Sequence, residues 1–313
     1  MGLGEAVEEH LLAVDHTHPT SAHRQPSKIS RLGDWERLTI RYFYGEGIFR
    51  MGKLPRIRFR ILEGKDGVRK LYDDLAEIYD RSRFLYLTRR LERCEEGVLS
   101  GWLKRLESPM LDVGCGSGRY SLKSAERGVE VISVDLSLNM LKIFLKKLEA
   151  RGLGESVHVV LADGENLPFR EGSFRGLLCT LTFDHFQEPE KAISEFSRVL
   201  EIRGLCIIST LNREHLNLIR RLLKIPADKI PFLGESIPPT LIYEVGHTGL
   251  EVQELLSTHG FKPVKLMGCC HWGLFTPFIP EPLFELLERL LVKLKSSMKH
   301  AVLHVVVAEK SPR

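Results

Sequence analysis

The sequence predicts an α/β protein built on a doubly wound, mostly parallel β-sheet. Short β-rich runs alternate with helical patterns from about residue 68 onward, as in a parallel sheet with crossover helices. A glycine-rich turn follows the first of these runs directly and leads into a helical pattern. Acidic residues stand at the ends of the first three runs, where open parallel sheets bind their ligands.

The predicted elements follow one another in a regular order. Residues 68–106 have the apolar spacing of one or two amphipathic helices. The strands expected after them are PMLDV, VEVISVD, VHVVLAD, FRGLLCTLTF and GLCIIST. The chain then continues with a helical LEVQELLSTHG, a strand FKPVKLM, an amphipathic PEPLFELLERLLVKLKSSM and a last strand AVLHVVVAEK.

Length and composition indicate a globular protein of the cytoplasm. The 313 residues are 43% hydrophobic, and a net charge of +4 is too small to favour a nucleic-acid partner. Six scattered cysteines without a C-x-x-C pair predict neither a disulfide framework nor a metal site. No apolar run approaches the roughly 20 residues that span a bilayer, and the first residues lack a basic signal region. The oligomeric state stays open.

Two segments interrupt the regular pattern. Residues 1–65 carry several histidines and arginines without steady periodicity, so we expect an N-terminal extension. It is either a disordered arm or a segment that precedes a true start at Met51, and residues 66–313 form the domain. Residues 212–248 contain a short basic helix and then a proline-punctuated stretch. Long insertions of this kind in compact domains are typical of lids.

The glycine turn is the most informative segment. Asp112 ends a strand, and Gly114, Gly116 and Gly118 follow at every second position. Such a turn needs backbone angles that side chains disfavour, and its bare backbone lets a ligand approach. A dinucleotide site requires G-x-G-x-x-G, but Arg119 occupies the sixth position. The Asp112 carboxylate would repel a pyrophosphate, whereas it suits a cation such as the ammonium of methionine.

Two further acids follow the next two strands. Asp135 ends the second strand, where a carboxylate can accept both ribose hydroxyls of an adenosyl group. Asp163 stands at the same edge after the third strand, and it can accept the amino group of adenine. The three acids should therefore converge on one crevice.

These segments resemble a known family. LDVGCGSGRYS, VDLSLNML, LADGENLPFREGSF and CTLTFDHFQEPEKAISEFSRVLEIRG are similar to the successive motifs of class I S-adenosylmethionine-dependent methyltransferases. The quinone-biosynthesis and small-molecule branch is the most similar, and YDDLAEIYD resembles its N-terminal helix. The resemblance covers about residues 68–210. One departure is Glu201-Ile202-Arg203-Gly204, where the family usually has K-P-G-G.

The resemblance implies a Rossmann-like sheet of seven strands, with AVLHVVVAEK as an antiparallel strand at the sheet edge. It also implies S-adenosyl-L-methionine as the cofactor. The residues that would bind it are Tyr79, Asp112, Gly114, Gly116, Gly118, Asp135, Leu136, Asp163, Gly164 and Thr180.

His185 is the leading candidate for a catalytic residue that faces the methyl acceptor. It follows the fourth strand, and a structural role as a cap of the loop before Pro189 is the alternative. A base is needed only if the acceptor carries a proton that must leave. Other candidates for the acceptor pocket are Asp184, Tyr243, His247 and His271.

The expected activity is methyl transfer to a small-molecule or lipid-like acceptor. The aromatic run HWGLFTPFIP and the amphipathic segment after it bring apolar groups near the crevice, so a peripheral membrane contact is a further hypothesis. Two alternatives remain. One is an RNA or protein methyltransferase that uses the basic N-terminal arm, and the other is a non-catalytic relative that only binds the cofactor.

Overall fold

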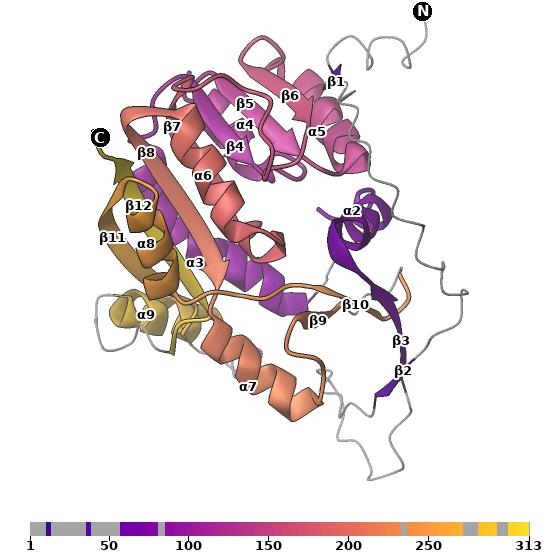
Figure 1. Ribbon diagram of the computed structural model, residues 1–313. Helices are drawn as coiled ribbons and strands as arrows, with labels where there is room; N and C mark the ends of the chain where they lie inside the picture. Colours follow the sequence, from indigo (N-terminus) through magenta and orange to yellow (C-terminus); the bar gives the residue numbers. More distant parts are fainter. Residues whose placement is uncertain are drawn as a thin grey trace, which may run out of the picture.

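The chain folds around one large β-sheet with a smaller sheet beside it (Figure 1). The structure is a computed structural model. It describes residues 11–13, 36–38, 57–80, 85–232, 237–271, 281–292 and 300–312. The disorder expected for the N-terminal extension concerns residues that lie, for the most part, outside these ranges.

The large sheet has the strand order β1-β6-β5-β4-β7-β8-β12-β11. The first six of these are mutually parallel, while β12 is antiparallel to both of its neighbours. The strands are β1 (Leu11–Ala13), β4 (Met110–Val113), β5 (Val131–Asp135), β6 (Val157–Leu161), β7 (Phe174–Thr180), β8 (Leu200–Leu211), β11 (Phe261–Cys269) and β12 (Leu303–Lys310). The predicted Rossmann-like sheet of seven mostly parallel strands is confirmed, with the three-residue β1 added at one edge.

One strand lies elsewhere than predicted. β12 is antiparallel, as expected, but it is inserted between β8 and β11 instead of forming the edge. The apolar run Val305–Ala308 explains this position, because all four side chains are buried and alternate between the two faces of the sheet. β11 is the edge strand, and its exposed Lys262 and Lys265 suit that place.

Helices cover both faces of the large sheet. One face packs against α3 (Leu85–Leu103), α4 (Arg119–Ala125) and α5 (Leu138–Arg151). The other packs against α6 (Pro189–Val199) and α8 (Gly249–Thr258). The two apolar layers lie back to back, as Met110 and Leu111 of β4 show by pointing into opposite layers. This is the doubly wound arrangement that strand–helix alternation predicts.

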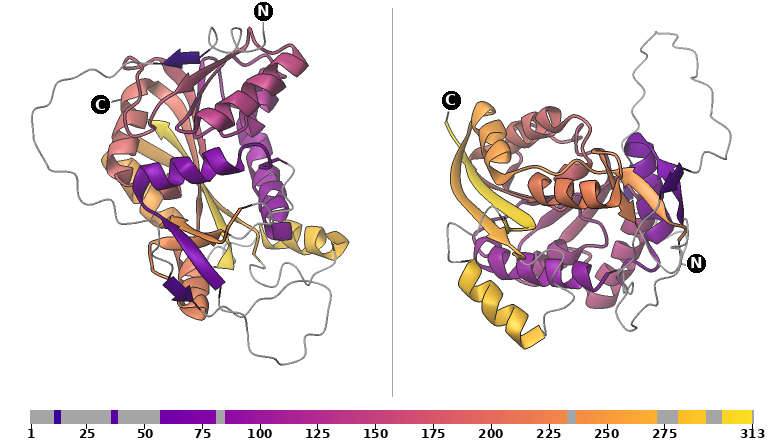
Figure 2. Two further views of the ribbon diagram at one scale, coloured as in Figure 1. Left: turned by 90° about the vertical axis from the view of Figure 1, so that its right-hand side faces the viewer. Right: turned by 90° about the horizontal axis from the view of Figure 1, so that it is seen from below.

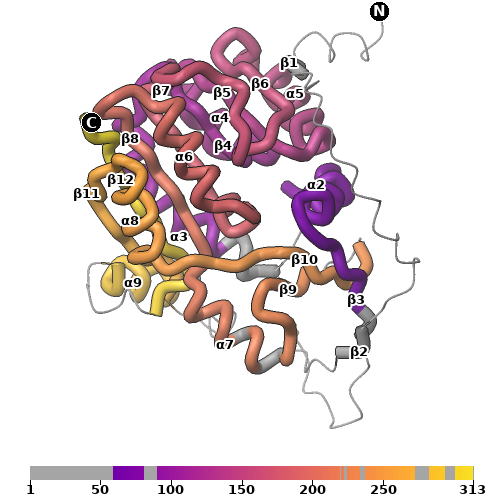
Figure 3. The backbone as a smooth tube through the Cα atoms, in the orientation of Figure 1, coloured from indigo at the N-terminus to yellow at the C-terminus, as the bar shows by residue number. Residues whose placement is uncertain are grey.

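The small sheet joins segments from distant parts of the sequence. Its order is β2-β3-β10-β9, and its strands are β2 (Glu36–Leu38), β3 (Ile57–Leu62), β9 (Lys229–Phe232) and β10 (Thr240–Tyr243). β3 runs parallel to β10, with Leu62 opposite Ile242. Figure 3 shows the indigo and orange segments side by side. β3 lies within residues 1–65, so the predicted extension contributes a strand to the predicted lid.

The helix α2 (Gly64–Leu75) begins directly after β3 and packs on the small sheet. Leu71 and Leu75 of α2 form one apolar cluster with Ile237 and Ile242. In the left view of Figure 2, α2 crosses in front of the large sheet. α7 (Arg213–Leu223) follows β8 and leads into β9, so the predicted insertion consists of this helix and two strands.

The remaining described elements are η1 (Phe183–His185), a short 3₁₀ turn after β7, and α9 (Glu281–Leu291). Among the described residues, no helix combines the length and apolarity that crossing a bilayer requires.

Removal of residues 1–50 should leave the fold intact, because it spares β3 and takes only two strands of three residues. Removal of residues 1–63 deletes the β3–β10 ladder as well. A decrease of about 1 kcal/mol in the free energy of unfolding lowers Tm by about 2–4 °C in a domain of 150–250 residues. Thermal melting should therefore give a Tm close to that of the full chain for the first deletion and a clearly lower one for the second. Equal losses in both variants would place residues 1–50 in the domain.

Candidate active site

The glycine turn between β4 and α4 has the backbone that its sequence predicts. Gly114, Gly116 and Gly118 all have positive φ, at 71°, 54° and 86°. A Cβ atom on Gly114 would lie 2.2 Å from the Thr182 side chain, and one on Gly118 would lie 2.0 Å from Phe144. A Cβ atom on Gly116 would meet nothing within 4 Å. Gly116 is thus the member of the turn that faces open space, where a ligand can reach the backbone.

Two carboxylates lie at the base of this turn, the buried Asp112 and the half-buried Asp135. Asp135 accepts hydrogen bonds of 2.8 Å from the backbone N–H groups of Gly116 and Ser137. Asp112 is 2% exposed and accepts a 2.5 Å hydrogen bond from the Ser121 hydroxyl. Burial raises the pKa of Asp112 to about 6 despite this hydrogen bond, and the nearby negative charge of Asp135 adds to the shift. Burial also raises the pKa of Asp135.

No cation of the described residues forms an ion pair with either acid. Arg119, which is close enough to lower the pKa of Asp112, is itself paired with Glu95. Two acids that repel each other are stabilised by a cation and destabilised by an anion. The electrostatics of the turn therefore favour a cationic ligand and oppose a pyrophosphate.

Asp163 lies two residues after β6 and has a partner that the sequence did not suggest. Its Oδ2 accepts a 2.6 Å hydrogen bond from Lys65 of α2, which also pairs with Glu165. Gly164 beside it has no room for a side chain, because a Cβ atom would lie 2.8 Å from Val113. A cavity of about 480 Å³ opens here, lined by Glu63, Gly64, Lys65, Asp66, Arg69, Leu136 and Gln187.

α2 and the turn after it lie across the ends of three parallel strands. Asp73 accepts a 2.6 Å hydrogen bond from Ser137 beyond β5, and Asp80 accepts a 2.8 Å hydrogen bond from Ser117 in the glycine turn. Lys65 makes the third contact, at Asp163 beyond β6. Tyr79 lies in the same turn, with its ring 6.1 Å from that of Tyr72. α2 and the turn after it therefore bond to the loops that follow β4, β5 and β6, and of the predicted cofactor residues Leu136 lines the cavity.

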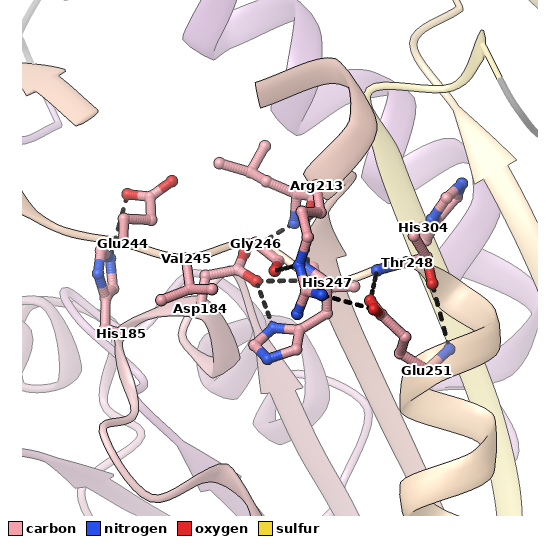
Figure 4. Close-up of polar contacts among 12 residues, drawn as sticks. Asp184, His185, Arg213, Glu244, Val245, Gly246, His247, Thr248, Glu251 and His304 are labelled. Atoms are coloured by element: carbon pink, nitrogen blue, oxygen red, sulfur yellow. Dashed lines mark hydrogen bonds and ion pairs between the residues drawn. The ribbon is translucent and has the colours of Figure 1, made fainter. Parts of the chain in front are cut away.

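His185 is buried beyond β7, and both of its ring nitrogens have protein partners. Nδ1 lies 3.1 Å from the Tyr243 carbonyl oxygen, which can only accept, so Nδ1 carries the proton and donates. Nε2 of the neutral ring then accepts from the Tyr72 hydroxyl at 2.9 Å. Burial lowers the pKa of His185 and keeps the ring neutral. Figure 4 shows His185 directly beside Glu244.

The other residues predicted for the acceptor pocket separate into two groups. Asp184 is buried and serves the fold, because it accepts a 2.7 Å hydrogen bond from the Leu211 N–H and bonds with Thr210 and His247 (Figure 4). His271 pairs with Glu288 of α9 at 2.8 Å. Tyr243 lies at the crevice side through its carbonyl contact with His185.

Several residues of the site carried no signal in the sequence analysis. Tyr72 and Glu244 lie next to His185. Arg220 bonds to the backbone directly after strand β10. Tyr72 stands within YDDLAEIYD, so the helical motif marked its neighbourhood. Glu244 and Arg220 belong to the insertion, where no periodic pattern points to them.

Known proteins share both the motifs and the fold. Residues 111–208 match the model of a family described as a methyltransferase domain. The demethylmenaquinone methyltransferase of Thermus thermophilus is 36% identical over 108 residues, which cover 34% of this chain and 48% of that protein. The malonyl-[acyl-carrier protein] O-methyltransferase of Methylovorus sp. is 32% identical over 164 residues, covering 50% and 53%.

A third relative gives the same picture. The demethylmenaquinone methyltransferase of Paenarthrobacter aurescens is 27% identical over 157 residues, covering 50% of this chain and 60% of that protein. This chain thus spans about half the length of the curated relatives it matches, from 48% to 60%.

Two solved structures share the fold at low sequence identity. The [4+2]-cyclase SpnF has a TM-score of 0.54 and 14% identity, over 82% of this chain and 100% of that one. The CcbJ methyltransferase of Streptomyces caelestis has a TM-score of 0.53 and 18% identity, over 77% and 98%. Residues 111–208 are thus similar to a methyltransferase domain, and the relatives named for demethylmenaquinone place this similarity among class I, S-adenosylmethionine-dependent methyltransferases near the quinone branch.

The raised pKa of Asp112 predicts a pH dependence of cofactor binding. A bound cation stabilises the ionised carboxylate, so affinity should rise with pH up to about 6, by up to about tenfold per pH unit, and then level off. Calorimetry between pH 5 and 8 measures this for S-adenosylmethionine. Adenosine, which lacks the cationic part, is the control and should show no such rise. An Asp112→Asn variant with the wild-type pH profile would contradict the assignment.

Proposed function

We propose that this chain transfers a methyl group from S-adenosyl-L-methionine to a small-molecule or lipid-like acceptor. The observation that carries the proposal is a pair of acids beneath a glycine turn, the buried Asp112 and the half-buried Asp135, which form no ion pair with any described residue. S-adenosylmethionine is a cation and fits this site, with the open side of Gly116 as the place of closest approach. When bound, the cofactor supplies a methyl group on a positively charged sulfur.

The predicted roles of the site residues are part of this proposal. Asp112 compensates the ammonium of the methionine part, and Asp135 accepts the ribose hydroxyls. Asp163 accepts the adenine amino group, which requires Lys65 to share or release that carboxylate. Leu136 lines the cavity beside Lys65, so the adenine end points there. Gly164 lies in the loop after β6 and Thr180 ends β7, both at the carboxyl edge of the sheet, and Tyr79 closes over the cofactor from the turn after α2.

The cover over the crevice supports a small acceptor. Methyl transfer needs alignment of the reacting atoms and the exclusion of water. α2, packed on β10, lies over the strand ends, and its Tyr72 bonds to His185, whose side of the site we assign to the acceptor. The relatives named for demethylmenaquinone and for malonyl-[acyl-carrier protein] indicate acceptors of small or carrier-linked kind. The arm on which an RNA or protein methyltransferase would depend lies largely outside the described residues.

Calorimetry with S-adenosylmethionine, its demethylated product and NAD tests the cofactor assignment. The first two should bind and NAD should not. Asp135→Ala should weaken binding by about 1.5–3 kcal/mol, the usual scale for loss of a charged hydrogen-bond acceptor. Binding of NAD without S-adenosylmethionine would refute the proposal. The fold also occurs in a [4+2]-cyclase, so formation of the demethylated product in a screen of quinone, lipid, small-metabolite and tRNA fractions is the test of transfer itself.

The insertion should select the acceptor rather than bind the cofactor. Replacement of residues 230–239 by a short Gly/Ser linker removes most of β9 and Ile237 but spares the contacts of α2 with Ser117 and Ser137. We expect turnover to be lost, while cofactor affinity should change by no more than about twofold. A twofold change corresponds to less free energy than the loss of one hydrogen bond. Measurement of both calorimetric affinity and turnover in this variant decides whether the insertion selects the acceptor. Loss of both would make the insertion part of the core, and retention of both would make it an inert loop.

A further inference from the structure

Glu244 is a buried acid with an unused oxygen at the acceptor side of the crevice. It follows β10 and is 7% exposed. Its Oε2 lies 3.7 Å from Nε2 of His185. Its Oε1 has no hydrogen-bond partner among the residues that the structure describes. A buried polar atom of this kind costs free energy unless a ligand or a proton satisfies it.

The backbone of Glu244 is held firmly from two sides. Its N–H donates a 3.0 Å hydrogen bond to the Asp228 carbonyl. Arg220 of α7 is largely buried. Its guanidinium donates hydrogen bonds to the carbonyl oxygens of Glu244, Val245 and Lys229. Apart from one contact with the Asn217 side chain, Arg220 donates its hydrogen bonds to the backbone around Glu244, and no ion pair joins it to the Glu244 carboxylate. The backbone of Glu244 is thus held in place, while its carboxylate is left to bind something else.

Glu244 also lies close to the cofactor crevice. Tyr72 connects Glu244 with the crevice. Its hydroxyl bonds to His185. Its pKa is raised by burial and by the charges of Tyr79, Glu244 and Asp135, so it lies near all three. Tyr79, whose ring contacts that of Tyr72, stands in the turn that bonds to the glycine turn.

We propose that Glu244 is the proton acceptor of this site and that the methyl acceptor is a neutral hydroxyl or amine rather than a carboxylate. This inference rests on the proposed function. Oε1 would contact the O–H or N–H group of the acceptor. Methylation would form an O–CH3 or N–CH3 bond from a lone pair of the nucleophile and would break the CH3–S bond, whose electron pair stays on sulfur. The proton of the nucleophile passes to Oε1, and the electron pair of the O–H or N–H bond stays on the oxygen or nitrogen. Glu244 becomes neutral and later releases the proton to water.

The surrounding charges support this choice of acceptor. Asp184 places a second negative charge near Glu244, while Arg220 offsets it only in part. His185 is kept neutral by burial, and the Tyr72 hydroxyl is neutral as well. A carboxylate acceptor has no proton to give at neutral pH and would meet like charge in a buried place whenever Glu244 is ionised. Tyr72 and His185 lie beside the carboxyl group of Glu244 as neutral groups that would face the same acceptor.

The pKa of Glu244 suits a base that works near neutral pH. Burial raises it to about 8, with a further rise from Asp184 and a partial offset from Arg220. The basic form therefore increases as pH rises towards 8. The unfolded chain loses this proton near pH 4.5, so wild-type stability should fall between about pH 4.5 and 8, because the folded state retains the proton in that window.

The test compares the wild type with Glu244→Gln, which keeps the shape but accepts no proton, and with Glu254→Gln, the same change at an exposed position of α8. Catechol, aniline and benzoate are titrated into each protein saturated with S-adenosylhomocysteine. The wild type and Glu254→Gln should bind catechol or aniline about tenfold more tightly than benzoate, the scale of one charge-assisted hydrogen bond. Glu244→Gln should lose this preference. The inference would be overturned if none of the probes binds, if benzoate binds as tightly as the other two, or if Glu244→Gln keeps the preference.

Turnover provides the second measurement. With an acceptor from the metabolite screen, wild-type kcat should rise with pH towards about 8. Glu244→Gln should lower kcat by roughly 100-fold or more, the usual contribution of a general base, remove the rise and leave cofactor affinity unchanged. Wild-type kcat and pH dependence in this variant would overturn the inference. Absence of S-adenosylhomocysteine binding in the wild type would instead refute the proposed function. Thermal melting of Glu244→Gln checks the fold, and the variant should lack the loss of stability between pH 4.5 and 8.

Discussion

The parallel pairing of β3 with β10 holds together everything that lies over the carboxyl edge of the large sheet. β3 leads within two residues into α2, which covers the glycine turn, and β10 leads directly to Glu244. One short ladder thus places both the cover of the cofactor crevice and the acid at its acceptor side. The apolar contacts of Leu71 and Leu75 with Ile242 make the two segments one unit. Disruption of this ladder should therefore disturb both halves of the site together.

The crevice is built against a strong electrostatic cost. Asp112 and Glu244 are buried and Asp135 is half-buried, and the described cations nearby form their bonds elsewhere. Arg220 shows this most clearly, since its guanidinium binds backbone carbonyl oxygens rather than a carboxylate. A fold selected for stability alone would pair or remove such acids. Their retention fits a site that is completed by a cationic cofactor and by a proton-donating acceptor.

The sequence predicted the parts of this structure that depend on local pattern. The strands and helices of the large sheet follow from alternation, and the turn at Gly114–Gly118 follows from its glycines and Asp112. The position of β12 was wrong, because apolar content shows that a strand is buried but not which neighbours it has. β3 was missed although Ile57, Phe59 and Ile61 alternate with arginines. Its partner lies far along the chain, and a short strand gains its stability only from such non-local pairing.

The acceptor site was the least predictable part, and the comparisons explain why. The family match ends at residue 208, whereas Tyr72 lies before it and Arg220 and Glu244 lie after it. The residues that shape the cofactor crevice fall mostly inside the match, so their roles can be compared with those of relatives. The acceptor side is formed by an insertion and by a segment upstream of the match, and these meet only in the folded chain. Acceptor chemistry in this protein must therefore be argued from its own geometry. The unused oxygen of Glu244 beside His185 is the feature from which that argument starts.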